Sequence, residues 1–289
     1  MSFETQSIFV VIATISGREL LLNRLLKSIK QHLRNCSYRT ICVYQCRNED
    51  LSQSKLIDFE CIDYFVRLNA FGASMARNIG IELALKNCSK NDYLTFPDDD
   101  CQFHKDIEQS IYFLMNQNVP VFFGDVRDFN DQKRLGISVF HKTKLLLNFF
   151  AINCPSFFIN AGVLHDTEIR FNEYFGPGST IKGVEETEFF SQLYRKGLRS
   201  AIYIKSLKII HPSQLHDTQK NIDYSYAQGF LLKKLFSQKS ILYWIYAFFV
   251  LPRPIFGYCV NIIKFNKHKS LFYKNRIEQI FLGFLQCKF

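Results

Sequence analysis

The chain has 289 residues, of which 47% are hydrophobic, and it carries a formal net charge of +10. This apolar content excludes wholesale disorder, and the length suits one large α/β domain with a smaller appendage. The charge is uneven, because residues 230–289 hold ten Lys or Arg and a single acid, Glu278. About +9 of the net charge therefore belongs to this C-terminal segment and says little about the partners of the rest of the chain.

In chain order, continuous apolar or β-branched runs predict strands, and apolar residues three and four positions apart predict helices between them. The predicted strands are residues 8–14, 40–44, 62–66, 93–96, 119–123, 201–204 and 207–210. The predicted helices are residues 18–32, 72–86, 104–116 and 186–196. From about Asp125 to Gly183 the periodicity weakens, and aromatic and Asn/Gly/Pro-rich loops take over.

This alternation predicts βαβ units and an open, mostly parallel, Rossmann-like sheet flanked by helices. Ligands of such sheets bind beyond the carboxyl ends of the strands, so the loops after those ends are the places to search for chemistry. We place the main domain at residues 1–220, with halves at about 1–125 and 126–220. A basic, aromatic and helical tail follows at residues 221–289.

Nine cysteines include no C-x-x-C pair and no zinc-type spacing, so we interpret them as buried free thiols rather than disulfides. The apolar run at residues 8–15 is too short for a signal peptide with its usual flanks. Both features favour a reducing, cytoplasmic location.

Three consecutive carboxylates, Asp98, Asp99 and Asp100, follow the strand at residues 93–96. Clustered carboxylates bind a hard divalent cation, because Mg²⁺ or Mn²⁺ prefers oxygen ligands and offsets the repulsion between like charges. The alternative is a solvated acidic turn before the helix at residues 104–116, although one acid would suffice there. The motif therefore favours a metal site.

Gly72 begins a predicted helix, whose first backbone N–H groups could bind a phosphate. Arg77 lies in the second turn and could reach the same anion through two hydrogen bonds. Small residues also begin helices for packing reasons, so this segment alone leaves both interpretations open.

Glu185 and Glu186 stand at the start of another helix, after the loop "FGPGSTIKG". A carboxylate there could act as a general base toward a hydroxyl, but acids at a helix N-terminus also stabilise the helix itself. His211 follows a further strand, where a lone His is more often structural than a ligand.

The order of these pieces resembles the glycosyltransferase family 2 enzymes with the GT-A fold. The matching segments are "FVVIATISGRELLLNRLLKSI", "GASMARNIGIELA", "YLTFPDDDC", "GVEETEF" and "IIHP". They extend over roughly residues 7–212. The succession of three Asp, two Glu and a His is specific, although no single piece is.

The resemblance implies roles for individual residues. Asp98, Asp99 and Asp100 are similar to the family's D-x-D-type motif, with Asp100 as the first choice for a metal ligand and with Asp98 and His211 beside it. Glu186 matches the second member of the family's acidic pair, the catalytic base, and Glu185 is the alternative. The implied nucleotide-sugar contacts are Thr14, Arg18, Gln45, Gly72, Arg77, Asp98 and Asp99. Gln45 stands where many relatives carry an Asp, which leaves the nucleotide base open.

The resemblance implies an inverting transfer, dependent on Mn²⁺ or Mg²⁺, of a hexose from a nucleotide-sugar, with UDP favoured. The acceptor would be a glycan or a lipid-linked sugar in cell-surface polysaccharide synthesis. The alternatives are a sugar-nucleotide pyrophosphorylase, a non-catalytic basic protein that binds membrane or nucleic acid, and an inactive donor-binding transferase. A pyrophosphorylase usually has a longer glycine-rich N-terminal loop than "ATISGREL", and a non-catalytic protein gives the acidic motifs no reason. We expect no nucleic-acid partner.

The tail contains an apolar run at residues 241–252, shorter than the about 20 residues that span a bilayer. Pro252 and Pro254 interrupt it, and lysines flank it. Basic residues around an aromatic, apolar segment predict an interfacial anchor on an anionic leaflet, peripheral or monotopic at the inner face of the cell membrane. The alternatives are a re-entrant hairpin and a helical hairpin packed on the main domain.

Overall fold

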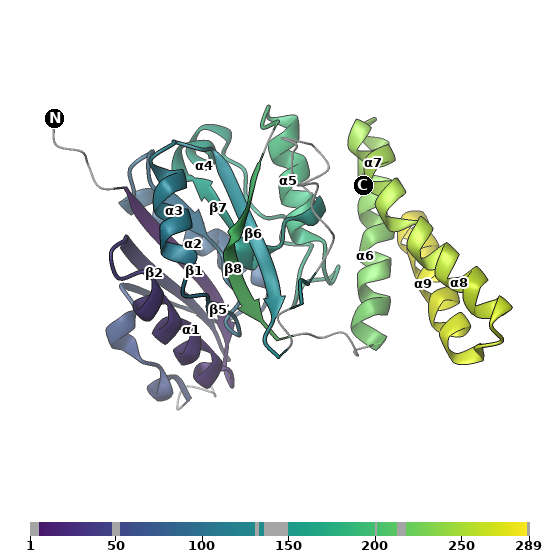
Figure 1. Cartoon of the computed structure of the whole chain (residues 1–289), viewed down its shortest axis with the longest axis horizontal. Helices are drawn as coiled ribbons and strands as arrows, with labels where there is room; N and C mark the ends of the chain where they lie inside the picture. The colour runs from purple at the N-terminus through teal and green to yellow at the C-terminus, as the bar shows by residue number, and fades with distance from the viewer. Residues whose placement is uncertain are drawn as a thin grey trace.

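The computed structural model describes residues 6–47, 53–130, 133–135, 150–199, 201–212 and 218–287. A sheet forms the centre of the main domain and helices flank it, while the helices after residue 217 stand beside this domain as a further layer (Figure 1). The chain therefore has the α/β architecture expected from its alternating pattern, followed by a helical C-terminal part.

The described residues form one eight-stranded sheet in the order β3-β2-β1-β4-β7-β6-β8-β5. Its strands are β1 (Ser7–Ile15), β2 (Ser37–Gln45), β3 (Tyr64–Leu68), β4 (Tyr93–Thr95), β5 (Gln102–Phe103), β6 (Val121–Asp128), β7 (Phe157–Asn160) and β8 (Ile202–His211). Six strands share one direction, whereas β7 is antiparallel to β4 and β6, and β5 is antiparallel to β8. The predicted open, mostly parallel sheet is confirmed.

The described helices include the four predicted in the main domain, together with α4 in the stretch predicted to be irregular and four helices in the C-terminal part. They are α1 (Glu19–His32), α2 (Ala73–Asn87), α3 (Ile107–Met115), α4 (Ala161–Thr167), α5 (Glu185–Arg195), α6 (Thr218–Ser237), α7 (Ile241–Val250), α8 (Pro252–Ile263) and α9 (Lys267–Gln286). Short 3-10 turns lie at Gln53–Leu56, Phe59–Cys61 and Cys154–Ser156.

Three parts of the sheet differ from the predicted elements. Strand β5 has only two residues and was not predicted. Strand β7 lies in the stretch predicted to be irregular, because its four residues are too few to show a period and the first three are buried. Strand β8 is continuous where two strands were predicted. Exposed Lys205 and Ser206 interrupt its apolar pattern, close to the point where its register with β6 shifts between Phe123 and Asp125.

Alternate residues of β1 enter two different apolar clusters, as the two-residue side-chain period of a strand requires. Phe9 and Val11 pack in the cluster that includes α2, while Ile8 and Val10 pack with the apolar stripe of α1. Helix α2 approaches β1 closely at Gly80, where a Cβ would lie 2.2 Å from Cγ1 of Val11. This packing holds the end of β1 and the start of α2, which both reach the site, in one arrangement.

The cysteines are all free, as predicted, and five of them are buried. Burial raises the pKa of the Cys42 thiol to about 12, which keeps it protonated in the core. Cys259 differs from the prediction because it is exposed on α8.

Helix α6 begins at Thr218 and so crosses the boundary predicted at residue 220. Its apolar side packs against the main domain in a third cluster, in which Leu231 and Leu235 meet Phe175 and Val184. Helix α6 is therefore packed on the main domain.

An ion pair adds to this contact. Lys234 of α6 pairs with Oε1 of Glu188 on α5, whose other carboxylate oxygen accepts a hydrogen bond from Gln192 at 2.7 Å. The Glu188 side chain is 0% exposed and that of Lys234 14% exposed.

We expect Lys234→Met to lower the free energy of unfolding by about 3–5 kcal/mol, because it leaves the Glu188 carboxylate buried without its partner. The matched control is Lys182→Met, which removes an exposed pair with Asp223 between the same two parts of the molecule and should change stability by less than about 1 kcal/mol. Urea denaturation of the three proteins measures both values. Equal, small losses in the two variants would contradict the prediction.

Candidate active site

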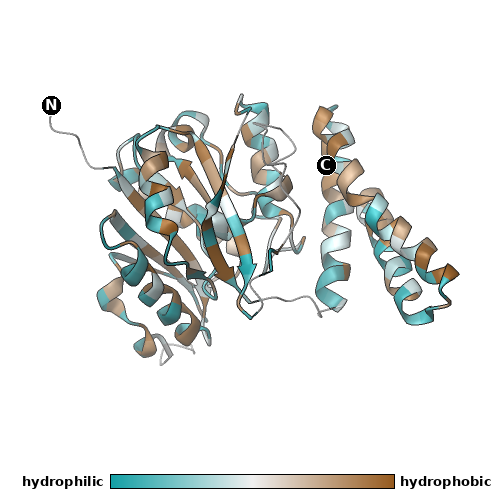
Figure 2. Ribbon diagram, in the orientation of Figure 1, coloured by the Kyte–Doolittle hydropathy of each residue, from teal (hydrophilic) through white to brown (hydrophobic). Residues whose placement is uncertain are grey.

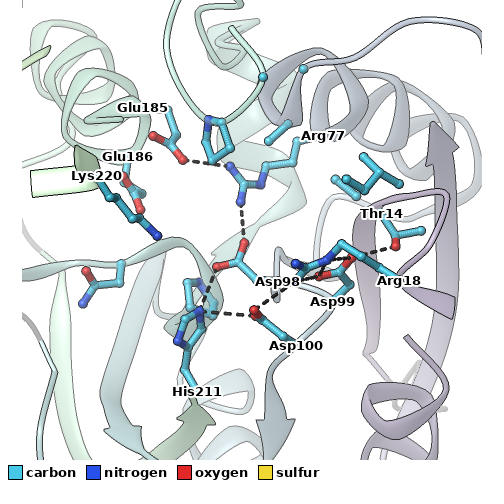
Figure 3. Close-up of a pocket in the computed structure, with 18 of the residues that line it drawn as sticks. Thr14, Arg18, Arg77, Asp98, Asp99, Asp100, Glu185, Glu186, His211 and Lys220 are labelled. Atoms are coloured by element: carbon cyan, nitrogen blue, oxygen red, sulfur yellow. Dashed lines mark hydrogen bonds and ion pairs between the residues drawn. The ribbon is translucent and has the colours of Figure 1, made fainter. Parts of the chain in front are cut away.

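A cleft of about 620 Å³ lies beyond the carboxyl ends of β1, β2, β4 and β8. Parallel α/β sheets bind ligands at this edge. All eleven site residues predicted from the sequence line this one cleft. Figure 3 shows ten residues labelled there, nine of which were predicted.

Asp99 ties the first loop of the cleft to the acidic motif. Its carboxylate accepts a hydrogen bond from Oγ1 of Thr14 at 2.7 Å and is held by Arg18 through Nε at 2.9 Å and Nη2 at 2.6 Å. Burial raises the pKa of Asp99, although the hydrogen bonds from Arg18 and Thr14 act in the opposite direction. Arg18 also reaches Oδ2 of Asp100 at 2.9 Å. The three residues therefore form a preformed wall on the side of β1.

Arg77 joins the acidic motif to the Glu pair. Its guanidinium, 3% exposed in the residue as a whole, donates to Oδ1 of Asp98 at 2.7 Å and to Oε1 of Glu185 at 3.3 Å. Burial alone would raise the pKa of Asp98, but hydrogen bonding to His211 and the charge of Arg77 outweigh it and lower this pKa to about 2. Asp98 is therefore ionised at any ordinary pH.

Asp98, Asp100, Cys101 and His211 place one ligand atom each within 4.8 Å of one another. Nε2 of His211 lies 3.3 Å from Oδ1 of Asp100 and 3.7 Å from Oδ2 of Asp98. Oδ1 of Asp100 is buried and accepts no hydrogen bond, so it offers a lone pair to a cation. This arrangement fits a divalent ion held by two carboxylates and an imidazole.

The proton on the His211 ring and the protonation of the Cys101 thiol decide which atoms of the cluster would serve as ligands. Burial alone would lower the pKa of His211, but the hydrogen bond and charge of Asp98 outweigh it and raise this pKa, so the ring tends to carry a proton on Nε2. Nδ1 lies 2.6 Å from the carbonyl oxygen of Pro212, and a ring that keeps its proton there would offer the lone pair of Nε2 to a cation in place of the Nε2 proton. Burial raises the pKa of the Cys101 thiol well above its ordinary value, and a protonated thiol is a poor ligand for a hard cation. Asp98, Asp100 and His211 are therefore the candidate ligands.

The two glutamates begin α5 and take different positions. Glu185 is buried and held by Arg77, whereas Glu186 is half-buried and its Oε1 accepts only a long hydrogen bond of 3.4 Å from the backbone N–H of Cys154. Glu186 and Lys220 both line the cleft (Figure 3). Burial and the neighbouring charge of Glu185 raise the pKa of Glu186 to about 8, and burial raises the pKa of Glu185 as well. Because Arg77 already pairs with Glu185, Glu186 is the more available base of the two once it has lost its proton.

Gln45 and Gly72 are hydrogen-bonded to each other in the cleft wall. Oε1 of Gln45 accepts the N–H of Gly72 at 2.7 Å, and its Nε2 donates to the carbonyl of Thr14 at 3.2 Å. The N–H of Ala73 donates to the carbonyl of Pro177 at 2.9 Å. The first N–H groups of α2 thus bind protein acceptors here, and a nucleotide contact by Gln45 or Gly72 stays a prediction.

Three residues of α6 also line the cleft and were missed from the sequence: Lys220, Asn221 and Tyr224. The ring of Tyr224 lies against Gly183, where a Cβ would come within 2.9 Å of its Cε1 and where φ is +118°. The signal was the polar, tyrosine-containing stretch "QKNIDYSY" just after His211, but a boundary placed at residue 220 divided it from the site.

Residues 9–164 match the family model described as Glycosyl transferase family 2. The chain belongs to glycosyl transferase family 2. The matched range includes Arg77 and the three aspartates but ends before Glu185, Glu186 and His211. The family assignment therefore rests on the half of the cleft formed by β1, α2 and the acidic motif.

Solved structures of glycosyltransferases share the fold. S. aureus TarS 1–349 in complex with UDP is 13% identical with a TM-score of 0.55, and the match covers 98% of this chain and 93% of that one. The mannosyltransferase PcManGT from Pyrobaculum calidifontis, in complex with GDP-Man and Mn²⁺, is 10% identical with a TM-score of 0.62 and coverages of 98% and 88%. A longer structure of S. aureus TarS is 14% identical with a TM-score of 0.57, and the match covers 80% of this chain but 39% of that one.

This family member thus spans about two fifths of the longer TarS chain that it matches. Comparison with curated proteins finds no match. At these identities the likeness extends to the fold, and the family model carries the assignment as a glycosyltransferase.

Proposed function

We propose that this chain is a metal-dependent, inverting glycosyltransferase that moves a hexose from a nucleotide-sugar, favouring UDP, to a hydroxyl of a glycan or lipid-linked acceptor. The observation that carries the proposal is the junction made by Arg77. This residue holds the acidic motif and the Glu pair on two sides of one cleft, so a donor bound at the first would present its anomeric carbon toward the second. Solved glycosyltransferases of this fold carry UDP, UDP-GlcNAc or GDP-Man in their complexes.

The donor side is the wall of Thr14, Arg18 and Asp99. Arg18 and Arg77 are the two guanidinium groups at the acidic motif, and both can hydrogen-bond a diphosphate. Asp98, Asp100 and His211 would hold Mn²⁺ or Mg²⁺, which when bound neutralises charge on the leaving diphosphate. Preformed ion pairs keep these side chains in place before the donor arrives.

The acceptor side is Glu186. In an in-line displacement the acceptor oxygen forms a bond to the anomeric carbon while the bond from that carbon to the diphosphate oxygen breaks. The hydroxyl proton passes to the Glu186 carboxylate, and the nucleoside diphosphate leaves with the electron pair. Glu185 is the weaker candidate because Arg77 already engages its Oε1.

The acceptor would be presented at the inner face of the cell membrane, in the synthesis of a cell-surface glycan. Support comes from the basic, aromatic C-terminal helices, one of which lines the cleft. A sugar-nucleotide pyrophosphorylase and a non-catalytic basic protein are both disfavoured by membership of a transferase family. An inactive member would keep donor binding but lack turnover.

Calorimetric titration with UDP, first with Mn²⁺ and then with EDTA, tests the donor site. We expect binding that weakens at least about tenfold when the metal is removed, because two of the three candidate ligands are carboxylates that otherwise repel a diphosphate. GDP and dTDP follow if UDP fails. Absence of binding by all three nucleotides with Mn²⁺ would contradict a donor site here.

A further inference from the structure

An apolar stripe runs along the outer side of α7 and α8. Its members are spaced three, four or seven residues apart and are all exposed: Ile241, Trp244, Phe248, Ile255, Cys259 and Ile262. Trp244 is 68% exposed and Phe248 73% exposed. Figure 2 shows hydrophobic colour along these helices, outside the main domain. A stripe of this length is unlike the scattered apolar residues of an ordinary protein surface.

The prolines interrupt the helix as expected, because α7 ends at Val250 and α8 begins at Pro252, but the exposed stripe continues across this break. Pro252 begins α8, a position where the missing N–H removes no helical hydrogen bond. The N–H of Leu251 still donates to Ala247, and that of Ile255 donates to Leu251 at 3.4 Å. By length and composition, Ile241–Ile263 is the one candidate membrane span among the described residues, with 22% of its most apolar window buried.

The opposite sides of α7 and α8 are packed against the rest of the protein. Leu242, Tyr246 and Val250 of α7 are buried in the cluster that includes Leu231 and Leu235 of α6. The ring of Tyr273 on α9 packs where a Cβ on Gly257 of α8 would come within 2.6 Å. Crossing a bilayer would separate α7 and α8 from these contacts with α6 and α9. The exposed stripe lies on the other side of the two helices and faces away from the protein along its whole length.

The charges around the apolar stripe indicate what binds to it. The described residues from α7 to α9 include one acid, Glu278, which pairs with Lys274. Basic residues flank the stripe, with Arg253 beside it and Lys264, Lys267 and Lys269 beyond its end, and all four are exposed. An apolar stripe with a tryptophan and a basic margin complements an anionic bilayer surface, whose headgroups attract Lys and Arg while the apolar side chains enter the acyl boundary.

We propose that α7 and α8 lie in the plane of an anionic leaflet as a monotopic anchor, with this stripe inserted and neither of the two helices crossing the bilayer. The proposal deepens the proposed function and rests on it only for the identity of the acceptor. Helix α6 joins the two: its first turns line the cleft, and its 20 residues span about 30 Å to the start of α7. The anchor thus holds the cleft within reach of acceptors carried on lipids in the same leaflet.

Vesicle flotation tests this surface, using phosphatidylcholine alone and a mixture containing phosphatidylglycerol. We expect binding to the anionic vesicles and a loss of at least about tenfold in Phe248→Glu, which places a charge in the stripe. The matched control is Phe113→Glu, because Phe113 on α3 is 63% exposed and lies outside the stripe. It should bind as the unaltered protein does.

The only tryptophan, Trp244, reports the depth. Its emission should shift to the blue on anionic vesicles and be quenched more by lipids brominated near the headgroup than by those brominated near the bilayer centre. Stronger quenching by lipids brominated near the bilayer centre would contradict the in-plane position of the helices. If the protein does not bind vesicles but light scattering shows a dimer that Phe248→Glu abolishes, the partner of the stripe is a second copy of this chain and not a bilayer. UDP titration of the same samples tests the donor site separately from the membrane anchor. If the unaltered protein binds UDP but not anionic vesicles, only the anchor is contradicted. If it binds anionic vesicles but not UDP, only the donor site is contradicted.

Discussion

Glu186→Gln is expected to lower turnover by about 10²–10⁴ while leaving UDP binding unchanged, because the amide keeps the shape of the side chain but cannot accept the acceptor's proton. UDP contacts are expected on the other side of Arg77, and within the described part of the chain Glu186 forms no ion pair with the acidic motif that the substitution would disturb. Transfer from a nucleotide-sugar and UDP calorimetry on the same protein give the two values. The control is Glu82→Gln, an exposed residue of α2, which should retain full turnover.

The same residue makes activity and stability respond to pH in opposite ways. A base must be deprotonated, so kcat/KM should rise with pH through about 8 and then level off, and Glu186→Gln should lack this rise. Between pH 4.5 and about 8 the unfolded chain has lost this proton while the folded chain still binds it. Folding stability contributed by the protonated form is therefore lost as pH rises through this window.

Removal of the carboxyl group should reverse the stability effect. Glu186→Gln should melt at a higher temperature than the unaltered protein above pH 8, and the difference should vanish below pH 4.5. A variant with full turnover would move the base to Glu185. Equal melting temperatures at all pH values would instead show that the carboxyl group titrates as it does in water.

Asp100→Ala is expected to remove the dependence of UDP binding on Mn²⁺. Its Oδ1 is the buried oxygen without a hydrogen bond, and it faces Nε2 of His211 at 3.3 Å, so it is the atom best placed to bind a cation. Loss of a residue that only orients a metal ligand already weakens metal affinity by about 10–100-fold, and loss of a ligand should weaken it by no less. Titration of Mn²⁺ into the protein, with and without UDP, measures this change.

Two comparisons make the Asp100 experiment specific. Asp166→Ala removes an exposed carboxylate, 63% accessible and paired with Lys90, and should bind Mn²⁺ and UDP as the unaltered protein does. Asp99→Asn should weaken UDP binding through the loss of the Arg18 contact but retain the response to Mn²⁺, because Asp99 is directed toward Thr14 and Arg18. A normal Mn²⁺ response in Asp100→Ala would exclude Asp100 as a ligand.

The order of strands and helices in the first half, apart from the two-residue β5, and the chemistry of the acidic motif could be read from the sequence alone. A buried parallel strand such as β1 needs a continuous apolar run, and clustered carboxylates at the end of β4 have few uses other than a cation. These features depend on residues close together in the chain, where the side-chain period of a strand or helix appears directly in the spacing of apolar residues. For the same reason β7 was missed, since four residues contain no period and its partners β4 and β6 are remote in sequence.

Tertiary structure decided how the motifs act together. Gln45 was expected at the nucleotide base, but its amide also binds the backbone of Thr14 and Gly72, a pairing across 27 residues that no local pattern reveals. Only packing separates Glu185, held by Arg77, from its neighbour Glu186, and only packing places α6 in the cleft rather than in a detached tail. The chain sequence determines which groups are present and where strands end; long-range contacts determine which of those groups are already bound and which remain for a substrate.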